Sequence, residues 1–245
     1  MSLLQVESVT VQFGGLQALS DVDLDVNAGG ITGLIGPNGA GKTTMFNVIC
    51  GLQPTTTGRV SFDGTDVTQL KPHERARHGL ARTFQRIEVF GSLTTRENIL
   101  VATEIRSRWS DEDVDTRGLT EKIIDRIDLR RVADHRVDAL PTGLARLVEL
   151  GRAIATAPRL LLLDEPSSGL GDEETRFFAR LLRELTDEGL GILLVEHDVE
   201  LVMELCERIH VLDFGRKIAA GTPPEVQKDP AVQAAYLGAA PGDAA

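Results

Sequence analysis

The chain has 245 residues, enough for one large or two small folded units, with the hydrophobic and charged content of a globular protein. Its net charge of -11 argues against nucleic acid as a partner, because contacts to phosphate need Lys and Arg. Cys50 and Cys206 lie far apart in apolar helical patterns, which argues against a zinc site or a disulfide scaffold and predicts buried thiols in a reducing compartment.

The first residues lack the basic and apolar regions of a signal peptide. No run of apolar residues approaches the ~18 that a membrane-spanning helix needs. We therefore expect a soluble, cytoplasmic protein that works at a membrane only through a partner.

The first third of the chain predicts strands and turns. Residues 3–13 and 19–29 alternate apolar and polar residues, as half-exposed strands do, and residues 30–35 form a continuous apolar run typical of a buried strand. A glycine-rich turn and a helix over 42–52 follow, with Gly51 placed as a C-cap. Residues 58–67 predict a hairpin with Asp63-Gly64 at its turn.

The middle of the chain predicts helices. From about Glu97 to Thr156, three segments place apolar residues at three- and four-residue spacing, and the charged, aperiodic residues 106–118 between them predict an exposed loop. The last third alternates again: strands over 159–164 and 190–198, helices over 173–189 and 199–207, and a final hairpin over 208–222. Strands that alternate with helices predict a parallel sheet covered on both faces.

The glycine-rich turn reads "GPNGAGKT" from Gly36 to Thr43 and matches the P-loop pattern G-x-x-x-x-G-K-[ST]. Glycines let the backbone curl until its N–H groups face phosphate oxygens, and the following helix N-terminus adds its dipole. Lys42 supplies a cation for the β- and γ-phosphates, the Thr43 hydroxyl is a ligand for Mg²⁺, and Thr44 reaches the α-phosphate. The predicted nucleotide-binding residues are Gly36, Pro37, Asn38, Gly39, Ala40, Gly41, Lys42, Thr43 and Thr44.

A chance glycine-rich turn is the alternative to a P-loop, but a predicted strand precedes the motif and a predicted helix follows it. The chain has no N-K-x-D guanine-binding motif, which favours adenine.

A second site follows the apolar run at 160–163, where Asp164 and Glu165 end a predicted buried strand. At the carboxyl edge of a parallel sheet, Asp164 is placed to hold Mg²⁺ and Glu165 to polarise an attacking water. The alternative is the ordinary enrichment of acids at a helix start. His197, after the next strand, either senses the γ-phosphate or is an ordinary polar residue at a strand end. Gln85 taken alone is an ordinary surface glutamine.

Together these motifs resemble the ATP-binding subunit of an ABC transporter, and the resemblance covers nearly the whole chain. The order is P-loop, Gln85, a signature region at 140–144, Asp164-Glu165 and His197. The resemblance implies an α/β fold of a P-loop NTPase core with a parallel sheet, an N-terminal antiparallel β subdomain and an inserted helical subdomain. It implies one domain over 1–238, with 1–85 and 158–238 as the core, 86–157 as the helical subdomain and 239–245 as a flexible tail.

The resemblance also implies roles for single residues. Phe13 would stack on adenine, Glu165 would be the catalytic base and His197 the switch residue. Gln85 would contact Mg²⁺ and the attacking water, so that Thr43, Gln85 and Asp164 form the metal site. The cofactors would be ATP and Mg²⁺.

The signature region departs from the family. The usual Leu-Ser-Gly-Gly-Gln is here Leu140, Pro141, Thr142, Gly143 and Leu144. Proline has neither the hydroxyl nor the N–H of the serine that meets the γ-phosphate on the opposite subunit. Thr142, Gly143 and a helix starting near Leu144 remain as the phosphate-directed elements. Gly171 likewise stands where the family commonly has Asp.

Residues 13–26, 34–51, 79–98 and 229–238 resemble the ATPases of branched-chain amino acid importers. This implies a peripheral subunit at the cytoplasmic face of the cell membrane, docked on integral permease subunits and served indirectly by a substrate-binding protein. Pro141 favours pairing with a different ATPase subunit, and a homodimer stays open. Three alternatives also stay open: a urea or amide importer ATPase, a soluble ABC ATPase that transports nothing, and a regulatory subunit that only binds ATP.

Overall fold

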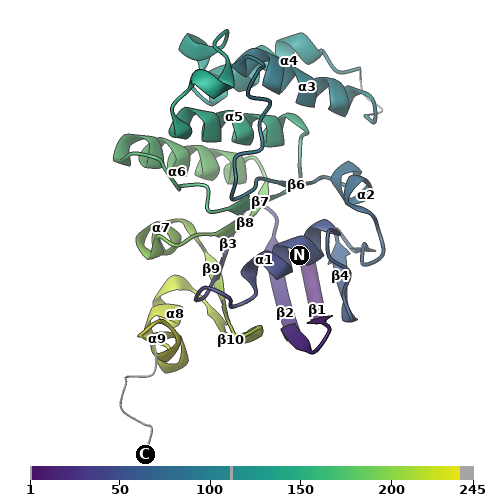
Figure 1. The fold of residues 1–245 in the computed structure, drawn as a ribbon, viewed down its shortest axis with the longest axis vertical. Helices are drawn as coiled ribbons and strands as arrows, with labels where there is room; N and C mark the ends of the chain where they lie inside the picture. Colours follow the sequence, from purple (N-terminus) through teal and green to yellow (C-terminus); the bar gives the residue numbers. More distant parts are fainter. Residues whose placement is uncertain (1, 111–112, 238–245) are drawn as a thin grey trace, which may run out of the picture. The chain divides into compact units, whose positions relative to one another are not determined.

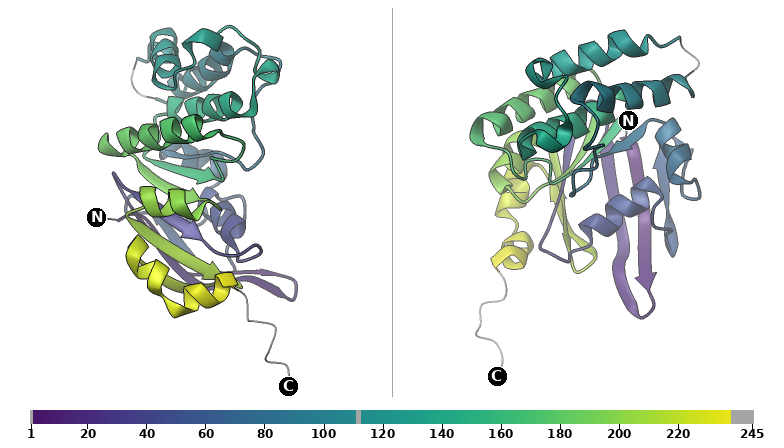
Figure 2. Two further views of the ribbon diagram at one scale, coloured as in Figure 1. Left: turned by 90° about the vertical axis from the view of Figure 1, so that its left-hand side faces the viewer. Right: turned by 45° about the horizontal axis from the view of Figure 1, so that its top comes forward.

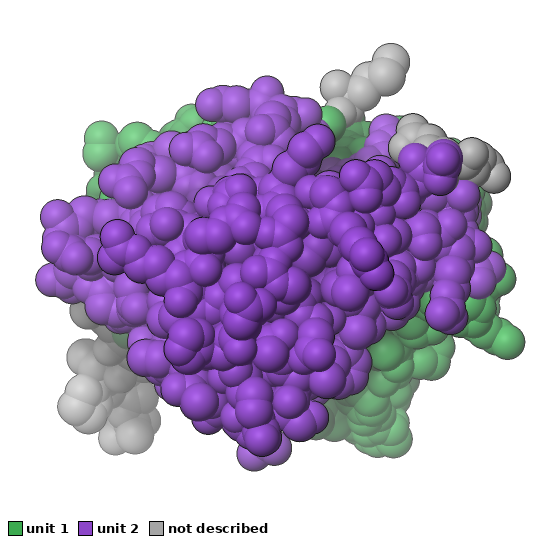
Figure 3. Space-filling model, turned by 90° about the horizontal axis from the view of Figure 1, so that it is seen from above, with its two compact units in different colours: residues 1–75, 191–245 green, residues 76–190 purple. Residues whose placement is uncertain are grey.

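The computed structural model describes residues 2–110 and 113–237. It divides into two compact units, unit 1 with residues 1–75 and 191–245 and unit 2 with residues 76–190 (Figure 3). The subdomain boundaries expected at residues 85 and 158 stay a prediction, and the expected tail at 239–245 lies outside the described residues.

Unit 1 contains an antiparallel sheet in the order β2-β1-β4-β5 (Figure 1). Its strands are β1 (Ser2–Phe13), β2 (Leu16–Asn27), β4 (Thr57–Phe62) and β5 (Thr65–Asp66). The alternation in β1 and β2 directs side chains such as Leu4, Val6 and Val11 into the core, where they are almost fully buried. Asp63 and Gly64 form the β4–β5 turn with positive φ angles of 50° and 74°, as predicted.

Unit 1 also contains four strands whose pairing is mainly parallel. They are β3 (Ile31–Ile35), β8 (Gly191–Val195), β9 (Arg208–Asp213) and β10 (Arg216–Gly221). Strand β3 pairs in parallel with both β8 and β9, and β10 pairs with β9 in the predicted hairpin. Strands β3 and β8 are buried along their whole length. The continuous apolar run at each position therefore predicted a buried strand correctly.

The helices of unit 1 are α1 (Lys42–Cys50), α7 (Val199–Leu205), α8 (Pro223–Lys228) and α9 (Pro230–Leu237), and α2 (Pro72–Arg77) ends just beyond the unit. Gly51 caps α1 with φ 75°, as expected. The buried Arg75 on α2 donates to Val48 O at 2.6 Å and Ile49 O at 2.7 Å, which satisfies carbonyl groups at the end of α1. Helices α8 and α9 lie beside β10 (Figure 2). Both cysteines are buried free thiols, and burial raises the pKa of Cys206 to about 12.

Unit 2 contains the parallel strands β6 (Leu80–Arg82) and β7 (Leu160–Asp164) and the helices α3 (Thr95–Ser107), α4 (Thr116–Arg126), α5 (Thr142–Ala155) and α6 (Asp172–Asp187), with short 3₁₀ turns at Arg130–Val132 and Val137–Ala139. Helices α3, α4 and α5 pack together (Figure 1). At Gly151 of α5, an added methyl group would meet Ile127 at 2.7 Å, so glycine permits this close approach.

Two expectations need adjustment. Helix α5 begins at Thr142 instead of near Leu144, with Pro141 as its N-cap, because proline is compatible with the extended backbone before a helix. The loop predicted over 106–118 is shorter at both ends, since α3 reaches Ser107 and α4 starts at Thr116 behind the capping side chain of Asp115. Strand β6 and helices α2, α8 and α9 were not predicted.

Candidate functional site

The P-loop lies between β3 and α1 in unit 1, as predicted. Its Gly36, Gly39 and Gly41 have φ angles of 151°, 81° and 105°. A side chain at Gly36 would overlap the carbonyl oxygen of Leu212, and one at Gly41 would meet Ala18 O at 2.9 Å. Glycine is therefore required by conformation and by space, and the turn is a cradle built from backbone.

Lys42 lies over this cradle. Its ammonium group donates to Gly36 O at 2.6 Å and to Pro37 O at 3.0 Å, and the residue is 8% exposed. A cation held at the rim of a turn of backbone N–H groups attracts phosphate oxygens. The P-loop residues thus fit the phosphates of a nucleotide.

The cradle is supported by other parts of unit 1. Gly215, in the β9–β10 turn, donates from its N–H to Ala40 O at 3.0 Å. Burial raises the pKa of the Tyr236 hydroxyl on α9, and the Gly36 backbone opposes this rise. Phe13, the predicted adenine contact, ends β1 and is 48% exposed. The support at Gly215 carries no sequence signal, because it joins residues far apart in the chain.

His197 follows β8, the parallel neighbour of β3. Parallel neighbours have their carboxyl ends at one edge of a sheet, so His197 and the P-loop leave the same edge of unit 1. The His197 N–H donates to Glu196 Oε2 at 3.1 Å and its side chain is exposed. The predicted position at a strand end is confirmed, and the role remains a prediction.

In unit 2, the pair β6–β7 brings together the other predicted residues. Arg82 pairs in register with Leu162, so that Gln85 and the Asp164-Glu165 pair follow the same edge. Gln85 Nε2 donates to Glu165 Oε2 at 3.0 Å. Glu165 has φ 51°, a conformation that costs a non-glycine residue about 1–3 kcal/mol. The contact brings the Gln85 amide to the Glu165 carboxylate, and the role of Gln85 stays a prediction.

Asp164 has a partner that sequence reasoning missed. Arg82 Nη2 lies 2.8 Å from Asp164 Oδ2, and both side chains are almost completely buried. The Arg82 guanidinium also lies 4.9 Å from the ring centre of Phe84. Burying a carboxylate without a partner is costly. The place of Arg82 at the end of β6 is the one sequence feature that could have indicated this pair.

The described residues contain no cluster of three or more His, Cys, Asp or Glu side chains suited to a metal ion. A Mg²⁺ site built from a hydroxyl, a carboxylate, phosphate oxygens and water does not require one. Thr43 lies in unit 1, and Asp164 and Gln85 lie in unit 2. The oxygen-bearing groups of these three residues are of the type that Mg²⁺ prefers.

The signature turn opens α5 in unit 2. Pro141, at the N-cap, makes no side-chain cap hydrogen bond, and Thr142 is exposed. Gly143 is buried with the Glu174 carboxylate against it, so that a side chain at this position would overlap that carboxylate. Glu174 Oε2 in turn accepts from the Gly171 N–H at 2.8 Å and caps α6. The turn therefore has an exposed hydroxyl and an adjacent negative charge.

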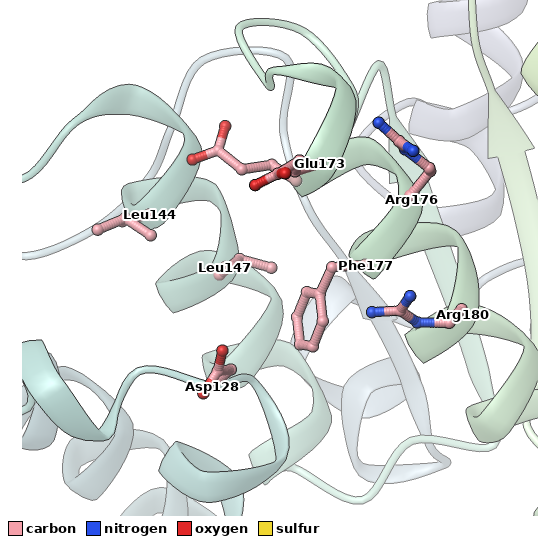
Figure 4. Close-up of a pocket in the computed structure, with 8 residues that line it drawn as sticks. Asp128, Leu144, Leu147, Glu173, Arg176, Phe177 and Arg180 are labelled. Carbon is pink, nitrogen blue, oxygen red and sulfur yellow. The ribbon is translucent and has the colours of Figure 1, made fainter.

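Leu144 lines a pocket of about 460 Å³ between α5 and α6 (Figure 4). Leu147 and Phe177 face one another there, with Arg176 and Arg180 on the side of α6. Leucine at the last signature position thus contributes an apolar side chain to a pocket lined mostly by charged residues, where the family's glutamine would have offered a polar group.

Comparison with known proteins identifies the class. The family model "ABC transporter" matches residues 19–168, and the model "Branched-chain amino acid ATP-binding cassette transporter" matches residues 216–241. The chain belongs to the ABC transporter ATPases, a family of cassettes that bind and hydrolyse ATP. This confirms the predicted family, fold class and enzyme class.

Individual relatives cover almost the whole chain. It is 38% identical to the high-affinity branched-chain amino acid transport ATP-binding protein LivG of Salmonella typhimurium, over 97% of this chain and 98% of that one. It is 35% identical, over the same shares, to the lipopolysaccharide export system ATP-binding protein LptB of Haemophilus influenzae. The solved ADP conformation of the cassette MJ1267 matches with a TM-score of 0.86 at 31% identity, covering 98% of this chain and 100% of that one.

Proposed function

We propose that the chain is the ATP-hydrolysing subunit of an importer for branched-chain amino acids. The observation that carries the catalytic part is the hydrogen bond from Gln85 to Glu165 at the carboxyl end of β6 and β7. It places a carboxylate that can accept a proton beside an amide that can orient water.

The P-loop residues and Phe13 bind the nucleotide in this proposal. The backbone N–H groups of the cradle and Lys42 hold the phosphates, Thr44 reaches the α-phosphate, and the exposed Phe13 ring offers a face to adenine. Thr43, Asp164 and Gln85 hold Mg²⁺, which supplies positive charge against the phosphate oxygens when bound. Arg82 keeps the Asp164 carboxylate oriented.

Glu165 then accepts a proton from the attacking water, with Gln85 orienting that water. Lys42 stabilises the charge that develops on the γ-phosphate. His197 reaches the γ-phosphate from the end of β8 and reports its presence.

The substitution Glu165→Gln tests this assignment. Nucleotide affinity should stay within about twofold, and turnover should fall by about 100-fold or more, because one group that accepts the proton is lost. Glu184→Gln, an exposed carboxylate on α6, is the matched control and should leave turnover unchanged. Continued hydrolysis in the Glu165→Gln variant would remove this residue from the role of base.

The substrate assignment is supported by the match of residues 216–241 to the branched-chain family and by the likeness to LivG. The likeness to LptB supports a second candidate, the ATPase of a lipopolysaccharide exporter. Purification of the chain with its native membrane partners separates the two. Amino acid permease subunits, with ATPase activity stimulated by a leucine-loaded binding protein, support import; lipopolysaccharide export subunits contradict it.

No helix in the described parts of the chain is both long and apolar enough to cross a bilayer. In the proposal the chain docks on integral permease subunits at the cytoplasmic face of the membrane, and a substrate-binding protein acts on it through them. The signature turn acts on the ATP of a second ATPase subunit. Pro141 favours a different chain as that second subunit, with two unequal ATP sites.

A further inference from the structure

Three charged residues of α5, Arg146, Glu149 and Arg152, face a single neighbouring segment. Their spacing of three residues places them on one side of the helix. The segment, residues 84–90, follows β6 and contains Gln85. We name these three side chains the α5 clamp.

Arg146 and Glu149 bond the segment at both kinds of backbone group. Arg146 donates to Phe84 O at 2.8 Å and to Gln85 O at 2.6 Å. Glu149 Oε1 accepts from the N–H groups of Phe84 and Glu88, each at 3.2 Å. Residues 84–90 are neither helix nor strand, so these bonds replace those of regular secondary structure.

The clamp is completed within α5 and at the far end of the segment. Arg146 donates to Glu149 Oε2 at 3.2 Å, and their side chains are only 7% and 6% exposed. Arg152 donates to Glu88 O and lies 4.5 Å from the ring centre of Phe90. Asn98 of α3 also bonds both the N–H and the carbonyl group of Phe90, at 2.9 and 3.0 Å.

Burial raises the pKa of Glu149 and lowers that of Arg152, so these charges are held at a cost of desolvation. Apolar side chains would pack α5 against a loop without this cost. Charged groups differ in that they fix the loop backbone at particular atoms, because each bond requires its own direction.

The side chain of Gln85 extends from this fixed backbone to Glu165 Oε2 at 3.0 Å. Helix α5 also begins at the signature turn, with Thr142 as its first residue. One helix thus connects the turn to the backbone that carries Gln85.

The geometry points to Arg146 and Glu149 as positioning residues for Gln85, because they hold the backbone from which its side chain reaches Glu165. This rests on the proposed function, in which Gln85 orients the water that Glu165 deprotonates.

A double-mutant cycle in the assembled transporter tests the inference. Glu149→Leu should lower kcat for ATP by about tenfold with KM within about twofold, the loss that one charge-assisted hydrogen bond to a loop amide supports. In the Gln85→Ala background the same substitution should cause no further loss, because its effect passes through Gln85. The inference would be overturned if Glu149→Leu lowered kcat by the same factor in the Gln85→Ala background as in the wild type. A change in KM alone would overturn it as well.

Two further variants guard against a simple folding defect. Arg146→Lys keeps the charge but cannot bridge two carbonyl groups and a carboxylate, so it should show the same dependence on Gln85. Glu149→Gln retains an acceptor for the two N–H groups and should recover part of the kcat lost in Glu149→Leu. Glu188→Gln, in an exposed ion pair with Arg126 in the same unit, is the control and should leave kcat unchanged.

Hydrogen exchange distinguishes failure of the clamp from failure of the proposed function. In Glu149→Leu, the amides of Phe84 and Glu88 should exchange about tenfold faster while amides of the P-loop are unaffected. Unchanged exchange overturns the clamp whether or not the assembly hydrolyses ATP. Faster exchange in an assembly where Gln85→Ala retains the wild-type rate refutes the catalytic role of Gln85, and with it the positioning role.

Discussion

Two helices of this protein begin at turns that the family directs at phosphate, and the two turns are built differently. The P-loop before α1 in unit 1 has three glycines with positive φ and a lysine across its rim. The turn before α5 in unit 2 has Pro141 as its N-cap, an exposed threonine and a glutamate carboxylate against Gly143. Neither helix has a side-chain cap hydrogen bond, whereas Thr94 and Asp198 cap α3 and α7.

The difference shows which parts of a phosphate site are local. The cradle of the P-loop is made by consecutive residues whose conformation only glycine adopts without strain. The signature turn keeps the helix N-terminus and its dipole, but lacks the serine and has a negative charge nearby. The P-loop carries its phosphate-binding groups in its own residues. The signature turn depends also on neighbouring groups, such as the carboxylate against Gly143.

The largest effect on stability and ATP binding is expected from substitutions in the P-loop, whose shape depends on the backbone conformation of its glycines. Gly36→Ala combines positive φ with overlap of Leu212 O, and should cost about 4 kcal/mol of unfolding free energy and weaken ATP binding more than about 100-fold. Gly39→Ala is the matched control, because Gly39 also has positive φ but nothing within 4 Å, so about 1 kcal/mol is expected. Urea unfolding and titration with a fluorescent ATP analogue measure both. Equal losses of unfolding free energy in the two variants would show that backbone strain alone accounts for the effect, and that the contact with Leu212 on β9 adds nothing.

This contrast also explains how far the sequence could predict the site. The P-loop was found because its chemistry lies in consecutive residues, and Asp164-Glu165 because a buried apolar run precedes them. The ion pair of Arg82 with Asp164 and the bonds of Arg146 and Glu149 to residues 84–88 were missed. They join residues about 60 to 80 positions apart, and no local pattern distinguishes them from ordinary charged residues.

The missed elements of the fold have a similar cause. Strand β6 has three residues, too few for any periodicity, and is defined by pairing with β7. Helices α2, α8 and α9 have six to eight residues, less than the length at which an apolar stripe is recognisable. Long elements with a clear period, such as β1 and α6, were predicted with nearly correct ends. Gln85 was assigned a role through family resemblance, and its contact with Glu165 needed the structure.

An effect of intermediate size on stability is expected from pH, through a histidine on β9, the strand that pairs with β3 before the P-loop. His210 on β9 pairs with Leu34 of β3 and is 1% exposed, and burial lowers its pKa to about 4. The Asp25 carboxylate favours protonation, whereas Arg208 and Lys217 oppose it. In the unfolded chain the pKa is about 6.5, so the unfolded state binds the proton first as pH falls.

The stability contributed by neutral His210 is therefore complete above pH 6.5 and is lost as pH falls towards 4. Between pH 7 and pH 5 the loss should be about 2 kcal/mol. Urea unfolding of the wild type and of His210→Gln at both pH values measures it, since other titrating groups cancel in the difference. If both proteins lose the same free energy between pH 7 and pH 5, His210 is not the group responsible.

The smallest effect, and the one that bears most directly on the comparison, concerns the signature turn. The double substitution Pro141→Ser and Leu144→Gln should raise ATP turnover of the assembled transporter about tenfold, because a hydroxyl and an N–H return to the face that meets the partner's γ-phosphate. Leu144→Gln alone is the control, since it restores no group at position 141 and should give less than half of that gain in free energy. ATP affinity of this chain's own P-loop should not change, because the restored groups act on the nucleotide of the other subunit. Unchanged turnover in the double variant would mean that Thr142 and the α5 N-terminus suffice, and that the two phosphate-directed turns differ in construction but not in effect.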